Sequence, residues 1–83
     1  MIEQNKRRNH RRLRVLKGAR IVFNERRSVI DCTVRDLSPV GALLLLPSTA
    51  GIPNEFELWV DNAFHTAHII RKGNGRIAVA WSN

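Results

Sequence analysis

Apolar side chains recur at every second position in one short run after another along this chain. In the first run Leu13, Val15 and Ile21 share one face, and the arginines of that run lie between them. A period of two places successive side chains on opposite faces of a strand, so each run predicts a half-buried β-strand. Because no helical periodicity of useful length accompanies these runs, the pattern favours an all-β fold.

Turn signals separate the runs and set their number. The strongest is Gly73-Asn74-Gly75, because an Asn-Gly pair readily supplies the positive φ values of a tight hairpin turn. Other turns or loops are expected at 24–27, 36–41, 47–54 and 61–62, which leaves strands at 13–23, 30–35, 42–46, 55–60, 63–71 and 76–81. Six short strands with frequent turns predict a small six-stranded antiparallel β-barrel. The 83 residues suffice for one small domain, in which we expect residues 13–83 to form the barrel and residues 1–12 a basic, flexible N-terminal arm.

Positive charge is concentrated at the N-terminal end. Six of the fourteen Lys and Arg residues lie in the first fourteen positions, where Glu3 is the one acidic residue, and the rest of the chain is nearly balanced. Such a segment indicates an anionic partner. Eleven of the fourteen are Arg, whose planar guanidinium suits phosphate or guanine edges and stacks on bases far better than a lysine ammonium does.

Enzyme, metal and cofactor chemistry find no support in the sequence. Cys32 is the single cysteine, and its alternation with Ile30 and Val34 predicts a buried structural thiol rather than a nucleophile. His65 and His68 are three positions apart, so on a strand they face opposite sides and would not bind one metal ion together. Since no nucleophile, base and orienting group occur together, we expect no enzyme activity, no metal and no cofactor.

The chain shows no sign of export or of membrane insertion. The N-terminus lacks the apolar stretch of a signal peptide, and the longest apolar run, at 40–47, is too short to span a bilayer. A single cysteine gives no reason to expect an oxidising compartment. The expected location is therefore the cytoplasm.

One short motif, Asp36-Leu37-Ser38-Pro39-Val40-Gly41, combines three useful chemical groups within one expected turn. The carboxylate accepts hydrogen bonds from base N–H groups, the hydroxyl donates to phosphate or base, and the glycine permits close backbone approach. The same residue types favour turns for local backbone reasons. The motif alone therefore leaves ligand binding and a plain strand connection both open.

A second motif precedes the first expected strand. Arg8 and Arg12 are four positions apart, so in an extended segment they fall on the same side and two guanidinium groups can converge on one ligand. Arg7 and Arg11 fit the same spacing. Taken alone, an arginine run is more typical of a solvated tail or of a nonspecific nucleic-acid arm.

The combination of these motifs with six strands resembles the PilZ domain of bacterial cyclic di-GMP receptors. Arg8 and Arg12 match the arginine motif of that family. Asp36, Ser38 and Gly41 match its Asp-x-Ser-x-x-Gly motif, so the similarity covers nearly the whole chain. The resemblance implies a ligand on the outer surface of the barrel, with the arm wrapping over it.

The resemblance also implies a role for each motif residue. Arg8 and Arg12 would contact phosphates and guanine edges. Asp36 and Ser38 would bind a guanine, and Gly41 would permit the turn. These assignments suit the ligand, because cyclic di-GMP offers two phosphates and two guanines to bidentate arginine contacts.

The expected function is that of a cyclic di-GMP receptor or adaptor, whose arm and barrel surface change on binding and signal to a partner protein. Arg7 would stack on a second, intercalated nucleotide, if two are bound. Two alternatives stay open. One is a basic barrel that binds RNA or DNA through the arm. The other is a ligand-free adaptor that docks another protein, for example around Trp59, which lies on the outward face of its strand.

Overall fold

The computed structural model describes residues 13–82, which form six β-strands joined by turns and one longer loop. The strands are β1 (Leu13–Phe23), β2 (Ser28–Ser38), β3 (Gly41–Leu45), β4 (Glu55–Val60), β5 (Ala63–Gly73) and β6 (Arg76–Trp81). The all-β, six-stranded fold predicted from the sequence is therefore confirmed. The arm predicted at residues 1–12 lies outside the described residues.

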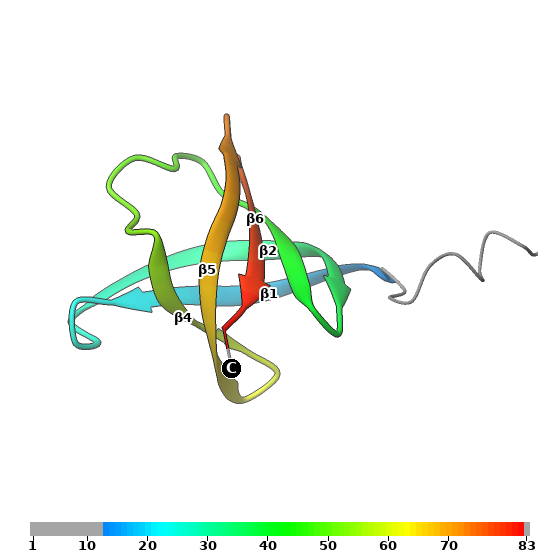
Figure 1. The fold of residues 1–83 in the computed structure, drawn as a ribbon, viewed down its shortest axis with the longest axis horizontal. Coiled ribbons are helices and arrows are strands. Elements are labelled where there is room, and N and C mark those ends of the chain that lie inside the picture. Colours follow the sequence, from blue (N-terminus) through cyan, green and yellow to red (C-terminus); the bar gives the residue numbers. More distant parts are fainter. Residues whose placement is uncertain (1–12, 83) are drawn as a thin grey trace, which may run out of the picture.

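The strands close into an antiparallel barrel in the order β1-β2-β3-β6-β5-β4. Two of its seams join strands that are not consecutive in the sequence: β3 pairs with β6, and β1 pairs with β4. In Figure 1 the long β1 and β2 strands run across the picture, and β5 and β6 cross them steeply. The β2–β3 turn lies beside the beginning of β1, where the chain enters the barrel.

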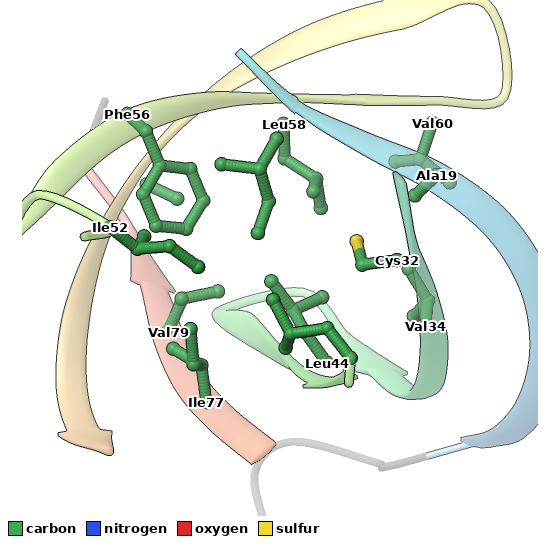
Figure 2. Packing of buried hydrophobic residues seen from close by; sticks show 13 residues of the cluster. Ala19, Cys32, Val34, Leu44, Ile52, Phe56, Leu58, Val60, Ile77 and Val79 are labelled. Carbon is green, nitrogen blue, oxygen red and sulfur yellow. The ribbon is translucent and has the colours of Figure 1, made fainter. Parts of the chain in front are cut away.

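The core is built from the inward side chains of all six strands (Figure 2). Its largest fully buried side chains are Ile21, Val34, Leu44, Leu58 and Ile77. Ile52, from the loop between β3 and β4, adds a further apolar side chain to this cluster. The alternation seen in the sequence thus corresponds to the inward and outward faces of the barrel.

Cys32 belongs to this core, and its side chain lies among the apolar residues in Figure 2. Burial, with a smaller contribution from the negative charge of Asp31, raises the pKa of the Cys32 thiol to about 11. The thiolate, which is the nucleophilic form, is therefore scarce near neutral pH. The prediction of a buried structural thiol is confirmed.

Lys17 falls on the inward face of β1, where it pairs with Val34 near the end of the barrel. Its ammonium lies 2.7 Å from the carboxylate of Asp61, in the turn between β4 and β5. This ion pair gives a charged residue on an otherwise apolar face an anionic partner at the barrel rim.

Two of the two-residue hairpin turns, those at Asp61-Asn62 and Asn74-Gly75, lie where the sequence predicts turns. Asp61 and Asn62 both adopt positive φ values, 54° and 62°, which is the geometry of the two-residue hairpin turn that matches strand twist. At the Gly73-Asn74-Gly75 turn, Gly75 has a positive φ of 70° and Asn74 does not. The location predicted from Asn-Gly is right, and the fully left-handed turn occurs at Asp61-Asn62 instead.

Candidate ligand-binding site on the outer face of the barrel

Asp36 faces outward because a bulge interrupts β2. Val34, which is fully buried, and Asp36 pair with consecutive residues of β3, so Arg35 is an extra residue between the two pairs. Without this extra residue the period of two would turn Asp36 to the same inward face as Val34. After the bulge Leu37 packs against the core, and the half-buried Asp36 lies on the outer face.

The Asp-x-Ser-x-x-Gly motif is mostly strand rather than turn. Asp36, Leu37 and Ser38 still belong to β2, and the turn itself consists of Pro39 and Val40. The predicted turn at 36–41 is therefore wrong at its beginning. The reason is that β2 continues across the bulge, which no local residue preference announces.

Ser38 closes this turn with its side chain. Its hydroxyl oxygen accepts hydrogen bonds from the backbone N–H groups of Val40 and Gly41, both at 3.2 Å. The hydroxyl donates toward the carbonyl oxygen of Gly41 at a longer 3.4 Å. Because a hydroxyl has one proton and two acceptor sites, the weakly engaged proton is the part of Ser38 that a ligand acceptor can take over.

Gly41 is required by a close approach between strands. It is buried at the start of β3, where it pairs with Ala80 of β6. A Cβ atom at this position would lie 2.0 Å from the carbonyl oxygen of Val79, a distance that real side chains do not show. The glycine therefore lets β3 pair with β6, and its φ is not in the positive range that would make it a turn residue.

Trp81 ties the motif to the last strand. Its indole Nε1–H donates to the carbonyl oxygen of Ser38 at 3.2 Å, and its backbone N–H donates to the carbonyl oxygen of Val40 at 2.9 Å. The ring also lies 5.2 Å, centroid to centroid, from the imidazole of His65. These contacts depend on the β3–β6 seam, which brings the end of β6 beside the β2–β3 turn.

A shallow hollow of about 200 Å³ opens on the outer face beside the motif. Its lining residues come from β2, β3, β5, β6 and the β2–β3 turn: Asp36, Ser38, Val40, Gly41, Ala42, Leu43, Ile70, Arg71, Ala78, Val79 and Ala80. The motif carboxylate and hydroxyl lie on its β2 side, and Arg71 lies on its β5 side. Residues of β3 and β6 form the floor between them, where Gly41, Ala78 and Ala80 are small and Leu43 is the large apolar side chain.

Two apolar side chains border this hollow while remaining open to solvent. Val40, in the turn, is 47% exposed, and Ile70, on β5, is 63% exposed. Val40 occupies one of the unspecified positions of the motif. Ile70 does not stand out in the sequence as a site residue, because β5 reaches the motif only through β6. Their exposure beside a carboxylate and an arginine gives the hollow both apolar and polar contacts for a ligand.

The predicted site residues Arg7, Arg8 and Arg12 lie outside the described residues. The structure does describe the point where their segment joins the barrel. Leu13, which follows Arg12 in the sequence, pairs with Leu37, in the middle of the second motif. The chain therefore enters the barrel directly beside Asp36 and Ser38.

A second hollow and an aromatic cluster lie elsewhere on the surface, and neither is lined by residues of the Asp-x-Ser-x-x-Gly motif. A hollow of about 440 Å³ lies between the 24–27 turn and β4. On the outer face of β4 and β5 the rings of Trp59 and Phe64 are in contact, tilted by 53° with their centroids 4.6 Å apart, and the Arg26 guanidinium lies 4.0 Å above the Phe64 ring. Arg26 also donates to both carboxylate oxygens of Glu57, at 3.0 and 3.3 Å, which lowers the pKa of that carboxyl.

The described part of the chain has neither a cluster of metal ligands nor a helix that could span a membrane. Residues 13–82 contain no group of three His, Cys, Asp or Glu side chains placed to hold a metal ion. His68 Nδ1 lies 2.9 Å from the hydroxyl of Ser82 instead. Within the same residues, no helix has the length and apolar character needed to cross a membrane.

Comparison with known families identifies the domain to which these groups belong. The family model described as the PilZ domain matches residues 5–83, which include both motifs. The chain belongs to the PilZ domain family. A comparison with curated proteins found no match.

Solved structures support the same PilZ fold. Five chains of known structure match. One of them is the crystal structure of the PilZ domain of CeSA from a cellulose-synthesizing bacterium, with a TM-score of 0.67. The two chains are 22% identical, and the match covers 88% of this chain and 81% of that chain. PilZ domains are known as cyclic di-GMP-binding domains, and the hollow beside Asp36 is where this chain places its second motif.

Proposed function

We propose that this PilZ domain is a bacterial, cytoplasmic receptor that binds cyclic di-GMP in the hollow beside Asp36. The observation that carries the proposal is the pairing of Leu13 with Leu37. Leu13 is the residue after Arg12, and Leu37 lies between Asp36 and Ser38. We infer from this pairing that the arginine motif meets the second motif on one surface of the barrel.

The chemistry of these groups matches the two parts of the ligand. Asp36 is a carboxylate on the outer face, suited to accept from the N–H groups of a guanine. Ser38 donates its weakly held proton to a base or phosphate oxygen. Arg8 and Arg12 supply bidentate contacts to phosphate or to guanine O6 and N7, and Arg7 supplies a plane on which a base stacks.

In this proposal Gly41 acts through the fold rather than through the ligand. Its backbone approach to Val79 joins β3 to β6, and the small residues of β6 then form the floor of the hollow. The family motif thus combines two ligand-binding side chains with one residue that shapes the surface beneath them.

We infer that binding is relayed to a partner protein through the surface around the hollow. Val40 and Ile70 are exposed apolar residues there, and Leu16, on the neighbouring part of β1, is 76% exposed. A ligand together with the arginine segment over this region changes which apolar side chains a partner meets. The response to cyclic di-GMP therefore requires no chemical reaction.

Thermal unfolding tests ligand binding to the native barrel. Cyclic di-GMP is expected to raise Tm progressively, by roughly 10 °C or more once its concentration is about a hundredfold above Kd, because a ligand of the native state stabilises that state. GMP at the same concentrations serves as the control and is expected to shift Tm far less. A Tm that stays constant from micromolar to millimolar cyclic di-GMP would contradict the proposal.

A further inference from the structure

The side of the hollow opposite Asp36 carries a positive charge that the two motifs do not include. Arg71 follows a second bulge, on β5: Ile69 pairs with Val79 and Arg71 pairs with Ala78, so Ile70 is the extra residue. Ile69 packs against the core, and the extra residue turns Arg71 to the outer face. The bulges on β2 and β5 therefore bring an acidic and a basic side chain to one surface.

Pairing across the sheet places these two residues on one line. Asp36 pairs with Leu43, Leu43 pairs with Ala78, and Ala78 pairs with Arg71. Paired residues share a face, so all four side chains lie on the outside of the barrel. Three interstrand spacings separate the Cα atoms of Asp36 and Arg71 by at most about 14 Å. Both residues line the same hollow, and an arginine side chain is long and flexible enough to reach a ligand held between them.

The guanidinium of Arg71 is not used by an ion pair within residues 13–82. The ion pairs of that part of the chain join Lys17 to Asp61, Arg20 to Asp31 and Arg26 to Glu57. Arg71 is exposed. Its position beside a hollow with an uncharged floor leaves its charge for a bound anion.

We propose that Arg71 is a third anchor of the nucleotide, binding a phosphate of cyclic di-GMP from the β5 side of the hollow. This inference rests on the proposed function and adds a residue outside both motifs. With Asp36 on a guanine and Arg71 on a phosphate, the ligand is held across four strands of the barrel. The planar fork of arginine binds two phosphate oxygens at once, which a lysine at this position would not reproduce.

The test compares Arg71→Ala with Arg27→Ala by isothermal titration with cyclic di-GMP. Arg27 is an exposed arginine at the opposite end of β2, so its replacement removes the same charge without touching the hollow. Arg71→Ala is expected to raise Kd about tenfold to a hundredfold, the loss typical of a charged hydrogen-bonded contact. Arg27→Ala is expected to leave Kd within about twofold of the unaltered protein, the change allowed for one remote, screened charge.

Arg71→Lys separates charge from geometry and is expected to give an intermediate Kd. Thermal unfolding of each variant without ligand checks that the barrel is intact, which we expect because Arg71 is exposed. A Kd for Arg71→Ala equal to that of Arg27→Ala would overturn the role of Arg71 and leave the site beside Asp36 standing. A failure of the unaltered protein to bind would overturn the proposed function, and this inference with it.

Discussion

Replacing Gly41 by alanine is expected to lower the free energy of unfolding by about 3 kcal/mol or more, at the upper end of what overpacking costs. The added Cβ would meet the carbonyl oxygen of Val79 at 2.0 Å and the Cα of Ala80 at 3.1 Å. Both are backbone atoms of a paired strand and cannot rotate away. The β3–β6 seam must open to accept the methyl group, and thermal or urea unfolding measures the loss.

Gly18→Ala is the matched control. Gly18 also lies within a strand, and a Cβ built there has no atom within 4 Å. This change is expected to be neutral or to stabilise by up to about 1 kcal/mol, because alanine restricts the unfolded chain. Equal stability of the two variants would contradict the close approach of β3 and β6. The comparison also shows whether ligand binding lost in Gly41→Ala reflects loss of the fold.

The joint replacement of Arg8 and Arg12 by alanine is expected to raise Kd for cyclic di-GMP at least about a hundredfold. Two charged contacts are removed, each worth about 1.5–3 kcal/mol. Asp36→Ala is expected to raise Kd about tenfold or more, because guanine N–H groups then lack their acceptor. Titration of each variant, with thermal unfolding as a check on folding, measures the effects.

Arg11 and Asp31 provide controls, since each carries the same charge as a site residue and lies in the same segment or strand. Arg11→Ala removes one arginine from the same segment, and Asp31→Ala removes a carboxylate whose side chain is 88% exposed on β2. Both are expected to keep Kd within about threefold of the unaltered protein, as for isolated surface charges. If the joint Arg8 and Arg12 replacement and Asp36→Ala raise Kd no more than these controls do, the site is elsewhere. Binding to polynucleotides that depends steeply on salt concentration and is unchanged by Asp36→Ala would instead favour the nucleic-acid alternative.

The fold was largely predictable because its core follows a period of two. Phe56, Leu58 and Val60 are all buried, as their alternation predicts. This pattern did not predict which residues of β2 face inward and which face outward after Val34. A bulge adds one residue to a strand, so every later residue of that strand changes face. Arg35 is the added residue because of how β2 pairs with β3, which is not visible in the local sequence.

The site was predictable only in part for a related reason. A resemblance in spacing named Asp36 and Ser38 as candidate site residues, whereas Arg71 and Trp81 reach them through the β3–β6 seam and the strand order. Contacts between strands that are distant in the sequence leave no local signal. The role of Gly41 was misassigned to the turn for the same reason, since the atom that forbids a side chain belongs to Val79.

Binding of cyclic di-GMP by the hollow beside Asp36, together with the arginine segment, is measured by isothermal titration of the full chain, with GMP as the control. We expect saturable binding of cyclic di-GMP, with a stoichiometry of one nucleotide or an intercalated pair per chain, and much weaker binding of GMP. The absence of binding heat for cyclic di-GMP at several temperatures, or equal binding of the two ligands, would contradict the proposed function.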